Sequence, residues 1–222
     1  MHPESRHFSQ VNNDDRENAI VYVIDDDELI RTSLSSLLRS VGHQVQTFAT
    51  TEDFLGVRHA SAPSCLILDV RLRGESGLTF QELLAKGGEL QMPIIFMTGH
   101  GDIAMSVRAM KAGALDFLVK PFRDQDMIDA VTNALERDAR RLQADRSIQT
   151  LRTCYQSLTP REREVIGLVV KGLMNKQIAA QMGIAEITAK LHRAQAMKKM
   201  ESRSVADLVR KIEALGVAAK ER

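Results

Sequence analysis

The sequence predicts an α/β domain followed by an all-α domain, and three observations support this. Short apolar runs alternate with segments of helical spacing through roughly the first 120 residues, whereas residues 158–215 show helical segments and no strand pattern. Lys and Arg number 16 against 22 Asp and Glu in residues 1–150, but 14 against 7 in residues 151–222. A basic domain behind an acidic one is typical of proteins that bind nucleic acid.

Five apolar runs predict the strands of the first domain. Strands that alternate with helices form a parallel sheet covered on both faces, and such buried strands are apolar along their whole length. We therefore expect a doubly wound, five-stranded parallel sheet. The five runs are 20–24, 45–48, 65–68, 94–97 and 117–119.

Segments with apolar residues at helical spacing lie between these runs and predict the helices that cover the sheet. Glycine and proline punctuate the joins, at Gly42, Pro93, Gly99 and Gly113. The helical patterns are Leu29, Leu34, Leu37 and Leu38; Leu78, Leu83 and Leu84; and Ala104, Val107, Met110 and Ala112.

Residues 124–157 predict one long helix that leaves the sheet domain. The segment holds no glycine or proline, and Ile128, Leu135 and Leu142 are spaced by seven. We interpret it as the last helix of the first domain continuing into a helical linker. The spacing of seven slips after Leu142, so any coiled coil there is short or broken.

The basic end predicts a compact four-helix unit. "LTPREREVI" opens its first helix, with Thr159 as the N-cap, Pro160 in the first turn and Glu162 three residues after the cap. Gly172 and Gly183 mark helix ends. The predicted helices are 160–171, 175–182, 186–200 and 204–215, and helices joined by short turns in a basic segment indicate a helix-turn-helix.

These patterns divide the chain into five parts and exclude several classes of protein. Cys65 and Cys154 are too few and too far apart in sequence for a disulfide framework or a metal-ligand pattern. No signal-like apolar run begins the chain, and no stretch approaches the roughly 18 apolar residues that span a bilayer. We expect a cytoplasmic protein with no membrane partner. Its parts are a mobile tail 1–18, a sheet domain 19–137, a helical linker 138–157, a helix-turn-helix domain 158–215 and a tail 216–222.

Polar residues follow four of the five predicted strands. Asp25 and Asp26 follow the first strand, Asp69 the third, Thr98 the fourth and Lys120 the fifth. A single aspartate after a strand is usually a turn residue or a helix cap. Because ligands bind at the carboxyl ends of parallel strands, however, we expect these residues to share one pocket.

An acidic pocket of this kind suits Mg²⁺. Three close carboxylates would titrate as a coupled set with raised pKa values unless a cation kept them ionised. Mg²⁺ prefers one or two carboxylates together with a phosphate oxygen, and an aspartate such as Asp69 can form an aspartyl-phosphate. Lys120 could neutralise a phosphoryl group there, and Thr98 could donate a hydrogen bond to it. Asp27 and Glu28 we assign to the start of the following helix.

Four motifs in the first domain resemble the receiver domain of two-component response regulators. They are "VIDDDE", "LILDVRLRGESG", "FMTGHGD" and "AMKAGALDFLVKPF", and the resemblance covers residues 20–137. It implies a flavodoxin-like fold and a cis Lys120–Pro121 bond. The implied roles are Mg²⁺ binding by Asp25, Asp26, Asp69 and the carbonyl of Arg71; phosphate acceptance from a histidine kinase by Asp69; and switching by Thr98, Lys120 and the aromatic Phe117. Arg73 departs from the family, which usually has proline there, and places an extra cation near the site.

The basic end resembles the LuxR-type helix-turn-helix of the NarL/FixJ response regulators, closest in look to the FixJ type. The match covers nearly all of 158–215 and implies a recognition helix at 186–200 that enters the major groove. We expect a core of Ile178, Ala179, Met182, Ile184, Ile187 and Leu191, and a DNA-facing side of Lys190, Arg193, Ala194 and Met197. Lys190 and Arg193 are candidates for base edges or for phosphate. The candidates for phosphate contacts are Asn175, Lys176, Thr188, Lys198 and Lys199.

The sequence thus favours a phosphorylation-controlled DNA-binding regulator of transcription, and not an enzyme. Its expected partners are DNA, a histidine kinase and a second copy of the chain, bound on phosphorylation or on DNA. Helix 204–215 could be the dimer seam or could simply pack on its own domain. Two alternatives remain open: a receiver that dimerises independently of phosphate, and a phosphohydrolase in which Asp25 and Asp27 act as nucleophile and acid–base.

Overall fold

A computed structural model describes residues 18–87, 91–99 and 103–216, and these fold as two compact units that divide between Leu142 and Gln143. The predicted tails fall outside the described residues except for Asn18 and Gly216, as does the end of the "FMTGHGD" motif. Within the described ranges, no helix is long and apolar enough to cross a membrane.

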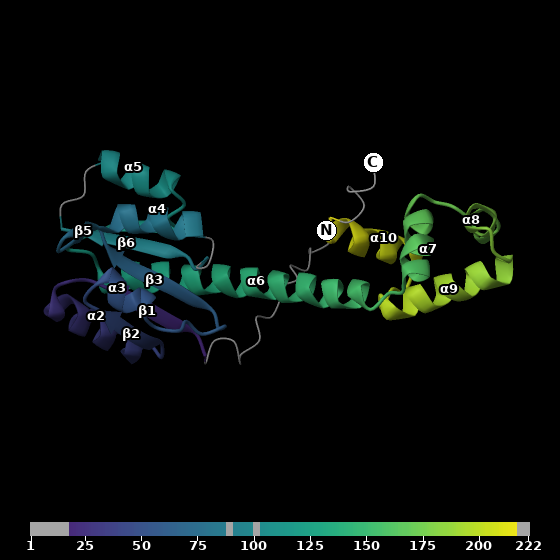
Figure 1. The fold of residues 1–222 in the computed structure, drawn as a ribbon. Helices are drawn as coiled ribbons and strands as arrows, with labels where there is room; N and C mark the ends of the chain where they lie inside the picture. Colours follow the sequence, from purple (N-terminus) through teal and green to yellow (C-terminus); the bar gives the residue numbers. More distant parts are fainter. Residues whose placement is uncertain (1–17, 88–90, 100–102, 217–222) are drawn as a thin grey trace, which may run out of the picture. The chain divides into compact units, whose positions relative to one another are not determined.

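The first unit is built on a five-stranded parallel sheet, as the sequence predicts. Its strand order is β2-β1-β3-β6-β7. Figure 1 labels four of these strands, β2, β1, β3 and β6. The central strands β1, β3 and β6 are buried along their whole length, which explains why they are apolar runs without alternation. The strands are β1 (Ile20–Ile24), β2 (Gln44–Phe48), β3 (Ser64–Asp69), β6 (Ile94–Thr98) and β7 (Asp116–Val119), and a hairpin β4 (Arg71–Leu72) and β5 (Glu75–Ser76) follows β3.

Helices cover both faces of this sheet and enclose two apolar cores. One core joins alternate strand residues to α2 (Glu28–Ser40) and to the start of α6 (Asp124–Gln156). The other joins the remaining strand residues, such as Tyr22 and Phe96, to three helices. These are α3 (Thr51–Leu55), α4 (Gly77–Gly87) and α5 (Ile103–Lys111). The sheet is therefore doubly wound, with its strand ends free to build a site.

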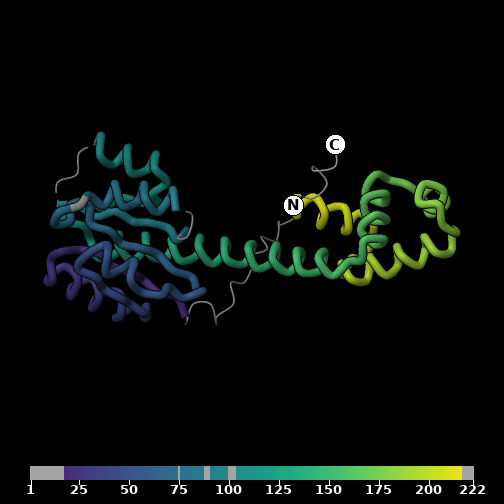
Figure 2. The backbone as a smooth tube through the Cα atoms, viewed as in Figure 1, coloured from purple at the N-terminus to yellow at the C-terminus, as the bar shows by residue number. Residues whose placement is uncertain are grey.

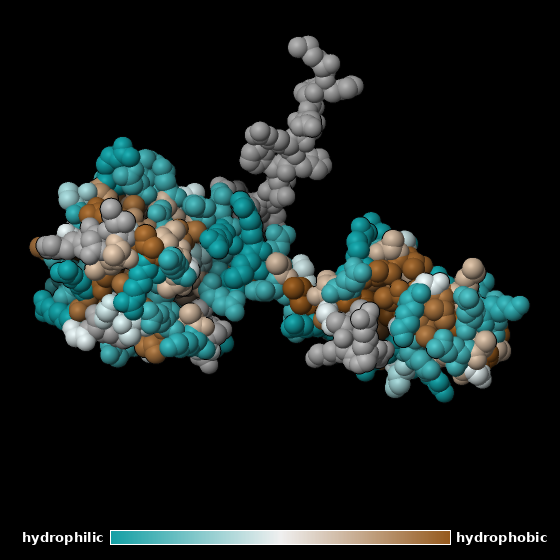
Figure 3. Space-filling view, turned by 90° about the horizontal axis from the view of Figure 1, so that it is seen from above, coloured by the Kyte–Doolittle hydropathy of each residue, from teal (hydrophilic) through white to brown (hydrophobic). Residues whose placement is uncertain are grey.

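Three residues of the predicted helical pattern in α5 are exposed: Ala104, Val107 and Met110. Val107 and Met110 are 45% and 47% exposed, whereas Ala109 is buried and Met105 packs against the core. Leu29 and Leu83 are also exposed. Apolar residues therefore reach the surface among hydrophilic side chains, as Figure 3 shows for one face. Helical spacing identified α2, α4 and α5, but it did not predict the short α3, and it did not identify which apolar residues of a helix are covered.

The long helix α6 forms as one continuous element from Asp124 to Gln156 (Figure 2), close to the predicted span 124–157. It is bound to the sheet by Asp138, which is 1% exposed. One carboxylate oxygen of Asp138 accepts the backbone N–H of Ser64 at 2.9 Å, and the other accepts Arg141 Nε at 2.8 Å. Two charge-assisted hydrogen bonds satisfy this buried carboxylate. The bond from Ser64 fixes α6 to the first residue of β3, whereas the bond from Arg141 lies within α6.

The second unit packs four short helices and the end of α6 around one core. The Thr159 side chain accepts the N–H of Glu162, and the Glu162 carboxylate accepts the N–H of Thr159, which completes the predicted capping box. Gly183 ends its helix in the left-handed conformation, at φ 65°. The helices are α7 (Pro160–Val170), α8 (Asn175–Met182), α9 (Glu186–Lys199) and α10 (Val205–Ala214), close to the predicted spans.

The last helix, α10, packs on its own unit through Leu208 and Ile212, which are both buried. Val205 lies at the surface and Val209 is half-buried. The packing that we considered for helix 204–215 is thus present, and its buried residues are Leu208 and Ile212.

Candidate functional site

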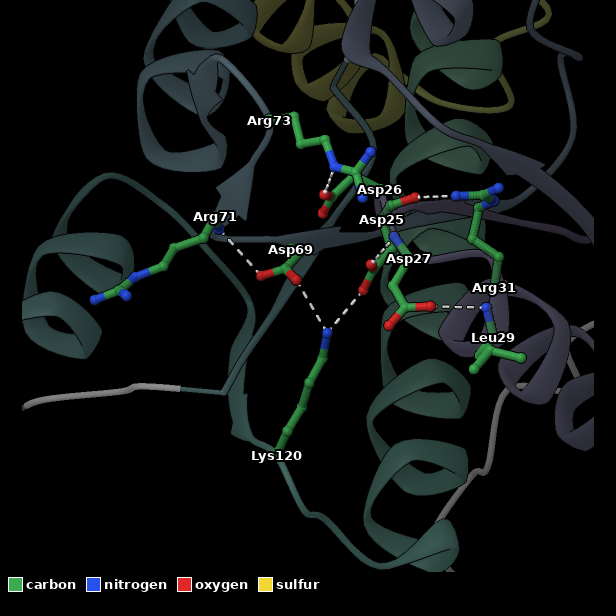
Figure 4. Close-up of polar contacts among 9 residues, drawn as sticks. All are labelled: Asp25, Asp26, Asp27, Leu29, Arg31, Asp69, Arg71, Arg73 and Lys120. Carbon is green, nitrogen blue, oxygen red and sulfur yellow. Dashed lines mark hydrogen bonds and ion pairs between the residues drawn. The ribbon is translucent and has the colours of Figure 1, made fainter.

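The strand register brings the predicted site residues of the first unit to one edge of the sheet. Ile24 lies opposite Leu68, so Asp25 and Asp69 follow on adjacent strands. Thr98 lies opposite Val119 at the ends of β6 and β7, and Lys120 comes next. Figure 4 shows Asp25, Asp26 and Asp69 converging with Lys120 reaching in from the following loop.

Three carboxylates form the centre of this site. One oxygen each from Asp25, Asp26 and Asp69 lies within 4.8 Å of the other two. Asp25 and Asp69 are 1% and 8% exposed, whereas Asp26 is half-buried at the rim. Hard oxygen donors at this spacing, open to solvent on one side, fit a divalent cation such as Mg²⁺.

Lys120 holds two of these carboxylates together. Its Nζ lies 2.7 Å from Asp25 Oδ2 and 3.0 Å from Asp69 Oδ2. Burial by itself lowers the pKa of Lys120, but the hydrogen bonds and negative charges of Asp25 and Asp69 outweigh it and leave the pKa raised. Lys120 is therefore a firmly charged ammonium group at the place where a phosphoryl group on Asp69 would need a counter-charge.

The four-acid run that follows β1 separates into two pairs with different environments. Burial raises the pKa of Asp25, and this exceeds the opposing effect of Lys120 and of the Asp27 N–H, which donates to Asp25 Oδ1 at 2.8 Å. Asp27 instead caps α2, since its Oδ1 accepts the N–H of Leu29 at 2.8 Å. Glu28 lies in the first turn, as predicted.

The loop after Asp69 is ordered by the aspartate itself. Asp69 Oδ1 accepts the N–H of Arg71 at 3.0 Å, which holds the peptide of Arg71 against the acid cluster, while the Arg71 side chain is exposed (Figure 4). The N–H of Gly77 donates to the carbonyl of Val70 at 2.9 Å and brings the start of α4 onto the strand end.

Arg73 contacts the acid cluster directly, which the sequence suggested only as an extra charge nearby. Its Nε lies 2.9 Å from Asp26 Oδ2. The Arg73 side chain is 87% exposed and extends from the β4–β5 hairpin (Figure 4). The sequence could not show this contact because it depends on the path of that hairpin.

The predicted switch residues lie on the same side of the sheet. Thr98 is fully buried at the end of β6. Phe117 in β7 is half-buried at the border of the second apolar core, with its ring centroid 6.4 Å from that of Phe96. The Lys120–Pro121 peptide bond is cis, as expected.

In the second unit the predicted DNA contacts fall into two groups. Lys176, Lys190 and Lys198 are exposed, and Thr188 is half-buried. The other three make protein contacts: Arg193 Nη1 donates to Asn175 Oδ1 at 2.8 Å, and Lys199 Nζ lies 2.7 Å from the buried carboxylate of Glu162.

The prediction of which α9 residues lie in the core was partly wrong. Ile187 and Leu191 are 73% and 55% exposed, whereas Ala189 and Ala196 form the buried side of α9. Met197, expected on the DNA-facing side, packs against the core. The small side chains of Ala189 and Ala196 let α9 lie close to the helices that cover it, and the larger Ile187 and Leu191 lie on the opposite, outward side. The outward side of α9 comprises Ile187, Lys190, Leu191, Ala194 and Lys198.

Each of the two units matches a known protein family. Residues 21–132 match the response regulator receiver domain, and residues 156–212 match the luxR family of bacterial regulatory proteins. The chain belongs to the response regulators with a LuxR-type DNA-binding domain. It is therefore a two-component transcription regulator of the NarL/FixJ class, a family of transcription factors and not of enzymes.

Similar proteins extend over nearly the whole response regulator. Nodulation protein W of Bradyrhizobium diazoefficiens is 53% identical over 201 residues, which are 90% of this chain and 88% of that protein. Transcriptional regulatory protein FixJ of Azorhizobium caulinodans is 41% identical over 203 residues, which are 91% and 95% of the two chains. The solved structure of response regulator StyR covers 88% of this chain and 98% of its own, with 47% identity and a TM-score of 0.80.

Family membership assigns a class of partner to each unit of this response regulator. A receiver domain implies a kinase, and a LuxR-type helix-turn-helix implies DNA. The acid cluster of Asp25, Asp26 and Asp69 is consistent with a metal site.

Proposed function

We propose that Asp69 of this response regulator accepts a phosphoryl group from a histidine kinase, and that the modification controls its binding to DNA. One observation carries the proposal: Asp69 is a nearly buried carboxylate that shares Lys120 with Asp25 at the end of the central strand β3. A phosphoryl group added to a carboxylate oxygen of Asp69 would lie close to Lys120 and to the other two acids.

The phosphoryl transfer is a displacement at phosphorus. A carboxylate oxygen of Asp69 attacks the phosphorus of a phosphohistidine, the phosphorus–nitrogen bond breaks, and the histidine leaves with the electron pair. Lys120 neutralises negative charge on the phosphoryl oxygens, and the Thr98 hydroxyl donates to one of them. Asp25, Asp26, Asp69 and the carbonyl of Arg71 would hold Mg²⁺, which stabilises charge on the transferring group when bound.

Phosphorylation is read out through the surface of the first unit. Thr98 moves toward the phosphoryl group, Phe117 repacks against the second apolar core, and a second copy of the regulator binds. The surface near these residues supports such an interface because Val107, Met110 and Val119 are each between 45% and 48% exposed. Apolar side chains that are grouped at a surface are typical of protein–protein contacts.

The outward side of α9 reads DNA in this proposal. Lys190 reaches base edges or phosphate, and Lys176, Lys198 and Thr188 contact phosphates. The exposure of Ile187, Leu191 and Ala194 supports apolar contact with thymine methyl groups. Arg193 and Asn175 contact bases or phosphate as a hydrogen-bonded pair. Lys199 would need to break its ion pair with Glu162 to reach a phosphate.

Replacement of the acceptor tests the first half of this proposal. The Asp69→Asn protein should take no radiolabel from acetyl phosphate or from a phosphorylated kinase, because an amide cannot form the acyl phosphate. The matched control is Asp53→Asn, an exposed aspartate in α3 of the same unit, which should label like wild type. Full labelling of the Asp69→Asn protein would show that the acceptor is another residue.

Binding to genomic DNA fragments with and without phosphorylation, followed by footprinting, tests the second half. Phosphorylated protein should bind with higher affinity and protect a two-fold symmetric site. Equal affinity in both states would support the alternative in which the receiver dimerises independently of phosphate. The phosphohydrolase alternative needs Asp27 as its acid–base residue. This role is disfavoured because the Asp27 carboxylate caps α2.

A further inference from the structure

We propose that Arg73 is an internal competitor of the divalent cation at Asp26, so that this residue sets how tightly the receiver binds Mg²⁺. The inference rests on the proposed function, in which Asp25, Asp26 and Asp69 hold the metal. The observation that carries it is the ion pair between Arg73 Nε and Asp26 Oδ2, at 2.9 Å.

Each acid of the cluster already has a cation of the protein beside it. Lys120 lies between Asp25 and Asp69, and Arg73 lies on Asp26 (Figure 4). Two cations of the protein therefore pair with the three carboxylates before any metal binds. A divalent cation that enters here meets carboxylates that are partly neutralised, and each nearby positive charge reduces their attraction for it.

The two cations of the protein differ in how easily they can be displaced. The Lys120 side chain is 19% exposed and bridges two carboxylates, whereas Arg73 is 87% exposed and its carboxylate partner is 25% exposed. An exposed ion pair is a weak interaction that water and salt compete with readily. Arg73 is therefore the cation that yields when a metal binds at the rim, and its departure is part of the free energy of metal binding.

Titration of the full-length, ¹⁵N-labelled protein with MgCl₂ tests this role. The dissociation constant is obtained from the backbone amide shifts of Asp26, Asp27 and Val70. The Arg73→Ala protein should bind Mg²⁺ about two- to fivefold more tightly than wild type at low ionic strength, the size expected of an exposed ion pair. Added NaCl should shrink this difference, and Arg73→Lys should give an intermediate constant because it keeps the charge.

Arg108→Ala is the matched control. Arg108 forms an ion pair of the same length with Glu82, at 2.9 Å, and the substitution removes one positive charge from the same unit at a distance from the acid cluster. Its dissociation constant should equal that of wild type. The inference is overturned if Arg73→Ala leaves the constant unchanged or raises it, or if Arg108→Ala lowers it equally. An Asp26→Asn protein that binds Mg²⁺ as tightly as wild type would overturn the metal site of the proposed function itself.

Discussion

Gly77 leaves no room for a side chain beside the strand that ends in Asp69. A Cβ atom at this position would collide with the backbone carbonyl of Asp69 and press on the Leu68 side chain at 3.1 Å. The collision is with backbone, so it can be relieved only by a shift of β3 or of α4. The sequence motif "RGESG" therefore ends in glycine because the helix start and the acceptor strand touch there.

The Gly77→Ala substitution should consequently destabilise the first unit by about 1–3 kcal/mol, as overpacking usually does. It should also slow the labelling of Asp69 by acetyl phosphate, because the carboxylate moves with its backbone. Chemical denaturation and label incorporation measure the two effects.

Gly87→Ala in the same helix serves as the control. Among the described residues, an added Cβ at Gly87 meets no atom within 4 Å beyond its own helix backbone and chain neighbours, so stability should stay within about 0.5 kcal/mol of wild type. Equal stability of the two variants would contradict the close approach of α4 to β3.

His59 makes the first unit sensitive to acid. Its ring lies 4.3 Å from Phe54 and 5.1 Å from Tyr22, centroid to centroid, and among the described residues neither ring nitrogen has a hydrogen-bond partner. Burial lowers the pKa of His59. The unfolded chain therefore binds the proton more readily, and the free energy of unfolding should fall as the pH drops below about 6.5.

The His59→Phe protein should lose much of this pH dependence because phenylalanine fills the aromatic cluster without titrating. Thermal unfolding between pH 7 and pH 5 measures the change. Some pH dependence of stability should remain because burial also lowers the pKa of His43. If the unfolding temperatures of wild type and His59→Phe fall equally between pH 7 and pH 5, His59 is not the cause of the pH dependence.

At the scale of elements, the Glu162–Lys199 pair ties the start of α7 to the end of α9. Glu162 Oε2 accepts both Lys199 Nζ and the N–H of Thr159, each at 2.7 Å. The hydrogen bond from Lys199, followed by those from Thr159, holds the pKa of Glu162 below its ordinary value of 4.5 despite burial. This stabilises the second unit above that pH, and the contribution is lost as the pH falls through the lowered pKa.

The Glu162→Gln protein should therefore be less stable than wild type at neutral pH, and the difference should shrink in acid. The helical circular dichroism signal of the full chain during thermal unfolding at pH 7 and at pH 4 and below measures this. Lys199→Met should have the same effect. A Glu162→Gln difference that stays constant with pH would rule out the ion pair as the cause.

The sequence predicted the elements well because their signals are local. Fully buried strands appear as unbroken apolar runs, and the Thr159 capping box is visible as threonine followed three residues later by glutamate. Sequence reasoning failed where tertiary packing decides which side is covered. Ile187 and Leu191 have the spacing of core residues, but Ala189 and Ala196 occupy the buried side of α9.

In the candidate site, too, some features were predictable from the sequence and others were not. Asp25, Asp69, Thr98 and Lys120 were predictable because parallel strands place their carboxyl ends at one edge. The contacts of Arg73 with Asp26, and of Asp138 with Ser64, were not predictable. Each joins segments whose approach depends on a hairpin or on the exact packing of a long helix.

For the whole molecule, the division of charge between the two parts of the chain predicts how salt affects DNA binding. The excess of positive charge lies after residue 150, in the part that carries α9. The logarithm of DNA affinity should fall linearly with the logarithm of salt concentration, since phosphate contacts release counterions. Lys190→Ala and Lys198→Ala should each lower that slope by about one per copy bound.

Fluorescence anisotropy with a labelled operator fragment at several NaCl concentrations measures this slope. Lys86→Ala, which removes an exposed lysine from α4 in the first unit, is the control and should leave it unchanged. If all three substitutions lowered the slope equally, net charge and not the outward side of α9 would govern binding.

The aromatic cluster around Tyr22 also has a spectroscopic consequence. The chain has no tryptophan and two tyrosines. Tyr22 is buried in β1 near Phe54, whereas Tyr155 lies near the end of α6 in the second unit, with the Arg163 guanidinium 5.6 Å from its ring centroid. Each unit thus contains one intrinsic fluorophore. Emission from a Tyr155→Phe protein reports on the receiver alone, and emission from a Tyr22→Phe protein on the DNA-binding unit alone, with no external dye.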